Sequence, residues 1–521
     1  MALGKLVRVV FVISEFRLIV LLLPMAVLLT GVMASLIDPV GFLAGVTAAN
    51  NWILIYFSSA FNWGSFAFVL TLVWIWFSKL GKVRIGGADA IPILKKWNWF
   101  AITLCTTIAI GILFWATAEP LYHFHQPPAS SDFGAASVDA RRFAMSSLFM
   151  HWSLTPYAIY TVPSLAFALA YYNLNKSYSL TGPISLVFAG AEKNGTKDII
   201  DAIALFSLVA GISASLGVGI LSIASGLAPY LGVSANGYLL AFVALAIVAA
   251  FMISSVSGLM HGIRLLSDWN VRFFFVLCAF LVVVGPAGKI VSYGFQGLFD
   301  YAQEFLPRSL GAGATGDKAW SSSWTTFYWA NWLAWAPVTA MFLGRIARGY
   351  TVREFIVFNL ILPSAFAVVW MSIFGASAIE IDQAGGGLYA VLQSDGPEAV
   401  IYQLFANLPF SAFWSIGFVI LSFVCFVTAA DSNTEAIAGI CHKSQNHPTI
   451  EQEERQPATF RLKVLWASLI GFTAWVMVTF SGVDGVRMLS NLGGLPALFI
   501  VLAMNMALIR MGTTHFKRVD G

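Results

Sequence analysis

The stretch SWTTFYWANWLAWAPVTAMFLGRIARG, Ser323 to Gly349, is apolar over about twenty residues and ends in basic side chains. A helix of about twenty apolar residues is long enough to cross the core of a bilayer. Basic residues collect on the cytoplasmic side of membrane helices, so Arg345 marks the inner end of this segment. We therefore predict a membrane-spanning helix over 322–344, with its tryptophans near the middle of the membrane.

The rest of the chain has the same apolar character. Of its 521 residues 59% are hydrophobic and only 10% are charged, and the mean hydropathy is +0.80. A soluble protein would carry roughly a quarter charged residues. We predict an all-α polytopic membrane protein with twelve transmembrane helices, and we exclude a β-barrel because the segments are continuously apolar. The expected spans are 17–37, 57–78, 98–118, 144–171, 200–230, 237–257, 271–293, 322–344, 354–378, 407–437, 462–482 and 488–510.

The distribution of basic residues supports this topology. With both termini in the cytoplasm, 23 of the 29 lysines and arginines fall on the inner side. A missed or additional span would destroy this bias. The six expected outside are Arg141, Arg142, Lys289, Arg308, Lys318 and Arg487.

Several classes of protein are excluded by what the sequence lacks. It contains no G-x-x-x-x-G-K-[ST] loop for a nucleotide, no H-E-x-x-H motif and no comparable metal cluster. No nucleophile–base pair suggests an enzyme. A transporter, a channel or an intramembrane enzyme remains, and a receptor that binds a ligand without moving it is a further alternative.

Three tryptophans and an asparagine stand out in the quoted stretch. Trp329, Trp332 and Trp335 recur at i, i+3 and i+6 and share a broad helix face, and Asn331 lies at i, i+4 from Trp335. An indole N–H and an amide need hydrogen-bond partners, so in the membrane they should face protein or a watery cavity. Ordinary packing is the alternative.

A second group of aromatic residues lies in HWSLTPYAIY, 151–160. Trp152, Pro156 and Tyr160 fall at i, i+4 and i+8, with Tyr157 beside them. An interfacial aromatic belt explains Trp152 well, but explains the two deeper tyrosines less well. Aromatic faces attract a quaternary ammonium group, which has no N–H to satisfy. We expect no carboxylate at the depth of these rings, which suits a permanently charged headgroup.

A third unusual stretch is TTIAIGILFWATAEPLYHF, 106–124. Small side chains at Thr107, Ala109 and Gly111 allow a helix to unwind or another backbone to approach closely. Tight helix packing is an equally good explanation. Glu119 and Pro120 are interpreted as a structural end to this helix.

These stretches resemble the betaine/choline/carnitine transporter family. Ser323–Gly349 looks like the family's signature, and AEPLYHF, HWSLTPYAIY, GIRLLSDWN and VTAADSNTEA match its other characteristic stretches in the same order. The resemblance covers about residues 15–510. It implies a secondary transporter in the inner (plasma) membrane of a bacterium, a quaternary-ammonium substrate, alternating access, and often a homotrimer. It implies neither an enzyme nor a nucleic-acid partner.

The resemblance also implies a division of the chain. Two peripheral helices over 1–97 would precede a first inverted five-helix repeat over 98–293. An extracytoplasmic amphipathic connector over 294–320 would lead to a second repeat over 321–511 and a short cytoplasmic tail over 512–521. Spans 3–7 and 8–12 would form the two repeats, with the substrate at their interface.

Site residues follow from the same resemblance. The family's aromatic box corresponds to Trp152, Tyr157, Tyr160 and Trp332, with Tyr157 in place of a tryptophan. The further candidates for substrate binding are Trp329, Asn331, Trp335 and Phe114. Asn331 stands where many members have tryptophan, so we expect it to tune the accepted substrate.

We expect transport to be coupled to an ion, but the sequence leaves the identity of the ion open. Sodium-coupled members use a consecutive threonine and serine, and here these positions are Thr428 and Ala429. Ser213 and Ser215 could offer oxygens to a second Na⁺ site, although packing is an equally good explanation. Sodium is preferred, with proton coupling or exchange as alternatives. Asp431 and Glu435 are interpreted as the inner end of the tenth span.

Overall fold

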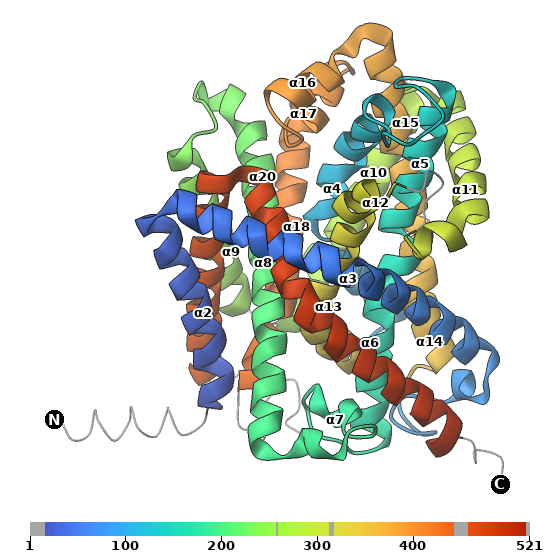
Figure 1. Cartoon of the computed structure of the whole chain (residues 1–521), viewed down its shortest axis with the longest axis vertical. Coiled ribbons are helices and arrows are strands. Elements are labelled where there is room, and N and C mark those ends of the chain that lie inside the picture. Colours follow the sequence, from blue (N-terminus) through green and yellow to red (C-terminus); the bar gives the residue numbers. More distant parts are fainter. Residues whose placement is uncertain (1–15, 257–258, 312–316, 442–456, 517–521) are drawn as a thin grey trace, which may run out of the picture.

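The computed structural model describes residues 16–256, 259–311, 317–441 and 457–516, and its regular structure there is helical apart from isolated bridges such as Arg84–Thr351 (Figure 1). This confirms the all-α prediction. The long helices are α2 (Leu18–Ile37), α3 (Pro39–Phe77), α4 (Lys96–His125), α5 (Val138–Trp152), α6 (Leu154–Asn173), α8 (Asn194–Leu231), α9 (Gly237–Val256), α10 (Leu259–Val284), α11 (Ala287–Ser309), α13 (Phe327–Arg345), α15 (Leu362–Ile381), α18 (Ser411–Cys441) and α20 (Pro457–Arg510). Short helices are α7 (Thr181–Ile184), α12 (Lys318–Ser321), α14 (Val352–Ile356), α16 (Leu388–Ser394) and α17 (Val400–Ala406). Single 3₁₀ or π turns are η1 (Lys79–Lys82), η2 (Ala189–Glu192), η3 (Ser322–Thr326), η4 (Val357–Ile361), η5 (Asp382–Gly386) and η6 (Met511–His515).

Helices lie over all twelve expected spans. In the described part of the chain, eight are long and apolar enough to cross a membrane, and the bent helix α4 makes a ninth if its two halves are one span. The other expected spans, 144–171, 237–257 and 322–344, lie over the broken pair α5–α6, the shorter apolar run of α9, and α13. Tryptophan and tyrosine rings with polar edges make α13 less apolar. A multi-pass membrane protein is confirmed, and the number twelve stays a prediction.

The helical backbone is interrupted at two places near the candidate site: within α4, and between α5 and α6. The axis of α4 bends by 56° between Thr107 and Gly111, within the run of small residues. Between α5 and α6 the backbone of Ser153 leaves the helical region, with φ −117° and ψ −112°. Pro156 then lies in the first turn of α6, where a missing N–H costs no intrahelical bond.

Helix α13 runs through the middle of the bundle. It contacts α6, α8, α18 and α20 (Figure 1). Asn331 is the one residue of this helix that is not buried. Two glycines permit this close packing. A Cβ on Gly494 of α20 would lie 2.3 Å from the carbonyl oxygen of Ala330, and one on Gly344 would lie 2.7 Å from the carbonyl oxygen of Ser164 in α6. Small residues at helix contacts let backbones approach in this way.

The connectors differ from expectation in their bounds. The amphipathic helix predicted over 294–320 is present as α11, which begins earlier, at Ala287, because Pro286 follows the end of α10. It lies along α5 and α15 at the edge of the bundle (Figure 1). Residues 312–316 of this connector, and residues 442–456 between α18 and α20, lie outside the described residues.

One helix end was predicted wrongly. Helix α4 does not stop at Glu119 and Pro120 but continues to His125, a turn and a half further. Pro120 lies within α4 where this helix packs against α5, α15 and α18, and membrane helices tolerate an internal proline inside a packed bundle. The extension carries Glu119 into the interior of the bundle.

Candidate functional site

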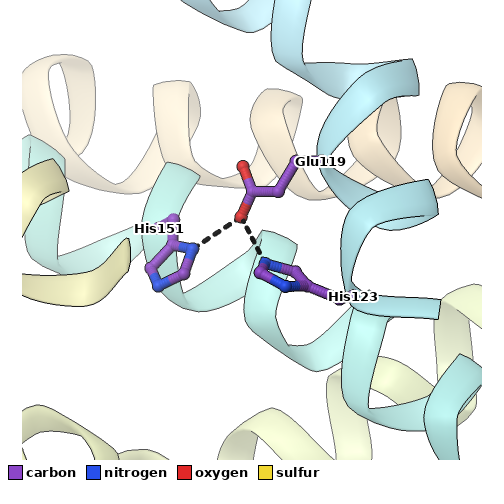
Figure 2. A group of neighbouring side chains, drawn as sticks. All are labelled: Glu119, His123 and His151. Carbon is purple, nitrogen blue, oxygen red and sulfur yellow. Dashed lines mark hydrogen bonds and ion pairs between the residues drawn. The ribbon is translucent and has the colours of Figure 1, made fainter. Parts of the chain in front are cut away.

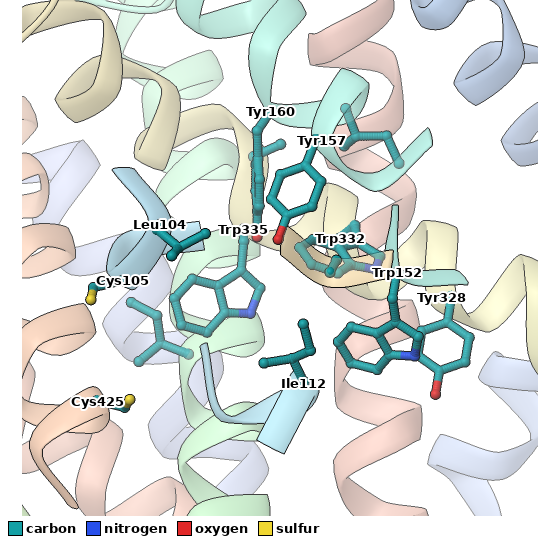
Figure 3. Close-up of a cluster of buried hydrophobic side chains, with 14 of the residues drawn as sticks. Leu104, Cys105, Ile112, Trp152, Tyr157, Tyr160, Tyr328, Trp332, Trp335 and Cys425 are labelled. Carbon is teal, nitrogen blue, oxygen red and sulfur yellow. The ribbon is translucent and has the colours of Figure 1, made fainter. Parts of the chain in front are cut away.

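Three aromatic side chains from α5 and α6 converge on Trp332 of α13. Its ring centroid lies 5.6 Å from that of Trp152, 5.9 Å from that of Tyr157 and 5.4 Å from that of Tyr160. Figure 3 shows Trp152, Tyr157, Tyr160 and Trp332 gathered together. Each of the four is at most 5% exposed. We call these four residues the aromatic cage. The structure brings together the residues expected to form the box, and their binding of a substrate stays a prediction.

The break at Ser153 sets the geometry of this cage. It separates Trp152, at the end of α5, from Tyr157 and Tyr160 on α6, so these three rings do not lie on one straight helix. Near the break, the indole Nε1 of Trp332 donates a hydrogen bond to the carbonyl oxygen of His151, 3.2 Å away. This supplies the partner that a buried indole N–H requires.

The remaining tryptophan candidates lie at two sides of the cage. Trp335 is 3% exposed and packs on Gly211 of α8, where a Cβ would lie 2.9 Å from its Cδ1. It also lines an apolar pocket together with residues such as Phe251 and Phe426. Trp329 is fully buried, and its ring meets that of His151 edge-on at 6.3 Å.

Phe114 and Asn331 are less clearly part of the cage. The ring of Phe114 packs edge-on against Trp115 with centroids 4.9 Å apart. Asn331 is partly exposed. In the described part of the chain, no recorded ring contact joins Phe114 to the four cage rings and no recorded hydrogen bond joins Asn331 to them. Their roles in binding stay predictions.

A buried carboxylate adjoins the cage, contrary to the expectation that no acidic residue lies at this depth. Glu119 is fully buried and accepts hydrogen bonds at Oε2 from Trp152 Nε1 at 2.7 Å and from the Tyr328 hydroxyl at 2.5 Å. Its Oε1 lies 2.6 Å from His151 Nδ1 and 3.3 Å from His123 Nε2 (Figure 2). The expectation failed because α4 continues past Glu119.

The sequence contained a signal for this group that was missed. Glu119 and His123 are four residues apart and so share a helix face, and His151 directly precedes Trp152. Their three ligand atoms lie within 4.8 Å of one another, so the statement that no metal cluster is present was too strong. However, the 2.6 Å between Glu119 Oε1 and His151 Nδ1 is a direct hydrogen bond. A zinc ion would hold two such atoms about 3.3 Å apart, so we describe a hydrogen-bonded cluster.

The candidate Na⁺ residues are polar groups inside or beside the bundle core. The hydroxyl of Thr428 is buried and donates to the carbonyl oxygen of Val424 at 2.8 Å. Ser213 is buried and Ser215 is partly exposed, both on α8. The sodium assignments stay predictions. The side chains of Asp431 and Glu435 lie outside the described residues.

Comparison with known proteins decides the family. The model of the betaine/carnitine/choline transporter family matches residues 19–517. The chain belongs to this family. The recognition from sequence is therefore confirmed, and so is the prediction that the protein is not an enzyme, because the family consists of transporters.

Curated relatives of the family match most of the chain. It is 33% identical to glycine betaine transporter 1 of Vibrio parahaemolyticus, over 85% of this chain and 83% of the relative. It is 30% identical to the glycine betaine transporter OpuD of Bacillus subtilis, over 88% and 86%. It is 27% identical to an ectoine/hydroxyectoine transporter of Virgibacillus pantothenticus, over 87% and 88%. A solved Na⁺-coupled sialic acid symporter overlays with a TM-score of 0.48 at 14% identity, covering 85% of this chain and 86% of that one.

Proposed function

We propose that this family member is a secondary transporter of a quaternary-ammonium or related compound, such as glycine betaine, choline or carnitine. Its aromatic cage would hold the cationic group. The observation that supports this most directly is the convergence of three rings on Trp332 at 5.4–5.9 Å. Rings at this spacing can present several π faces to one cation, which attract it without an ion pair.

The burial of the cage supports transport by alternating access. Every ring of the cage is at most 5% exposed, so a ligand cannot reach it from water without a rearrangement. The interruptions that adjoin the cage, at Ser153 and between Thr107 and Gly111, offer hinges for such a change. Relatives named for glycine betaine and for ectoine support a small charged or zwitterionic organic substrate.

We propose the remaining architecture on the resemblance and the positions of the helices. Twelve spans would place both termini in the cytoplasm of a bacterial cell. Residues 98–293 and 321–511 would form two inverted repeats, flanked by the peripheral helices over 1–97, the connector over 294–320 and the tail over 512–521. Coupling to Na⁺ is the preferred driving force, with proton coupling or exchange as alternatives. The assembly would be a homotrimer in the bilayer.

Uptake by the purified protein in liposomes tests the function. Glycine betaine, choline and carnitine are each offered with a sodium gradient, with a proton gradient and with neither. We expect accumulation of at least one of them against its gradient. Specific binding without accumulation would instead support a receptor that does not transport.

Trp332→Ala tests the site in the same assay. Loss of a desolvated cation–π face costs about 2 kcal/mol, or more than about tenfold in affinity. Trp63→Ala on α3 is a matched control because that side chain is 58% exposed on the outside of the bundle. Normal affinity in Trp332→Ala would show that the cage is not the substrate site.

A further inference from the structure

The cluster of Glu119, His123 and His151 is buried and ionisable, and it lies beside the aromatic cage rather than among its four rings. All three side chains are fully buried, and they come from α4 and α5 (Figure 2). Intramembrane ionisable residues are costly and are candidates for function. Nothing in the proposed cation–π recognition uses them, so their presence needs an explanation.

In the described part of the chain, the ion-pair partners of Glu119 are His123 and His151 of the same cluster. The guanidinium of Arg308 on α11 also acts electrostatically on His123, but it is paired with Glu304 at 2.6 Å and donates a hydrogen bond to Ser147. A buried carboxylate without a cation carries a large desolvation cost. The cluster is therefore neutral when it holds one proton beyond those of two neutral imidazoles, and carries one negative charge when it does not.

The two histidines offer different positions for that proton. His151 is hydrogen-bonded at both nitrogens, through Nδ1 to Glu119 and through Nε2 to the Thr325 hydroxyl at 3.0 Å. His123 has its Nδ1 buried with no hydrogen-bond partner in the described residues, and its ring lies against Trp320 and Trp324. A neutral imidazole with a free lone pair can take up a proton there.

Hydrogen bonds connect the cluster to the cage at two points. Glu119 Oε2 accepts from Trp152 Nε1, and the main-chain carbonyl of His151 accepts from Trp332 Nε1. The carboxylate is thus separated from the interior of the cage by one indole ring. Two charges at such a separation, away from bulk water, interact strongly.

We propose that the Glu119–His123–His151 cluster is a proton-binding site that competes with an organic cation in the cage. With its proton bound, the cluster is neutral; when the cation enters, the cluster releases that proton to solvent and its negative charge faces the cation. By reciprocity, a bound proton lowers the affinity for the cation, and a bound cation lowers the affinity for the proton by the same factor. The affinity for a zwitterion should depend less on the proton, because the ligand's own carboxylate offsets part of its positive charge. This inference rests on the proposed function of the cage.

Calorimetric titration of the purified protein tests the proposal. Choline and glycine betaine are titrated between pH 5.5 and 8, at each pH in two buffers that both have their pKa near that pH but differ in ionisation heat, so that the difference in heat reports the protons released. We expect choline to release up to about one proton and to bind roughly tenfold more weakly at the acid end, with a smaller change for glycine betaine. If neither of these ligands binds, and carnitine does not bind either, the proposed function fails. If choline binds with the same affinity and no proton release throughout, only the present proposal fails.

Variants locate the proton. Glu119→Gln removes the charge at nearly constant shape and should abolish proton release. If that variant does not fold, His123→Gln serves instead, because His123 does not touch the cage rings; it should shift the pH midpoint while choline still binds. His125→Gln is the matched control two residues further along α4, since His125 pairs with Asp382 and stacks on Tyr389. The proposal would be overturned if His125→Gln shifted the pH midpoint of choline binding as much as His123→Gln does. It would also be overturned if the chelator EDTA removed the pH effect, because the cluster would then be binding a metal ion.

Discussion

Gly111 lies directly against the ring of Trp152. A Cβ placed on Gly111 would be 2.7 Å from Cη2 and 3.1 Å from Cζ3 of that indole. The ring cannot move away freely, because its Nε1 is hydrogen-bonded to the buried carboxylate of Glu119. The glycine next to the bend of α4 therefore sets the position of one wall of the cage.

Gly111→Ala is expected to damage binding. Overpacking of a well-packed site costs about 1–3 kcal/mol, which here would displace Trp152 from the cage. We expect the affinity for the transported substrate to fall by roughly tenfold. Equilibrium binding to purified protein measures the effect. Gly288→Ala on α11 is the control, since no atom lies within 4 Å of its added Cβ; equal affinities in the two variants would contradict the assigned wall.

Arg17 connects the start of α2 to two other parts of the bundle. Its guanidinium pairs with Asp201 and Asp198 of α8, each at 2.6 Å, and donates to the carbonyl oxygen of Ile440 in α18. Arg17→Met would leave the fully buried Asp201 without its cation, which costs about 3 kcal/mol. Thermal unfolding in detergent should show a clear loss of stability.

A more exposed ion pair provides the comparison for Arg17. Lys176 and Glu192 lie 3.4 Å apart, with side chains 30% and 38% exposed. Glu192→Gln should cost at most about 1 kcal/mol, since water screens such pairs. A melting temperature that falls as much in Glu192→Gln as in Arg17→Met would show that burial is not what makes the Arg17 pair important.

Asn331 is suited to a test of specificity. It is the one residue of α13 that is not buried, so a larger side chain can be accommodated there. Asn331→Trp should change the order of preference among choline, glycine betaine and carnitine, measured by competition for uptake. Asn331→Leu removes the amide without adding a ring and separates the two effects. An unchanged order in both variants would make Asn331 a packing variation.

The features predictable from sequence are those that depend on short-range periodicity. Apolar runs located the helices that lie over the twelve expected spans. The spacing of Trp332, Tyr157 and Tyr160, together with the family resemblance, identified the rings that the structure brings together. The position of Glu119 could not be obtained in this way. It depends on α4 continuing through Pro120 and on His151 of α5 and Tyr328 of α13 meeting Glu119 there, which are tertiary contacts that local patterns do not encode.

Thr428 allows sodium coupling to be tested directly. Na⁺ is a hard cation that binds to oxygen ligands, and the family pattern of two consecutive hydroxyls is reduced here to Thr428 followed by the buried Ala429. If Na⁺ binds at this position, Thr428→Val should raise the sodium concentration needed for half-maximal uptake. Ala429→Ser, which restores the second hydroxyl, should lower it.

Uptake into liposomes over a range of sodium concentrations, with potassium as the replacement ion, measures both changes. Thr473→Val on α20 is the matched control, because it removes a buried threonine hydroxyl from another helix. Sodium-independent uptake by the unmodified protein would reject sodium coupling. The driving force would then have to come from a proton gradient or from exchange, and the cluster of Glu119, His123 and His151 would be the first place to look for the proton, because it is ionisable, buried and hydrogen-bonded to the cage.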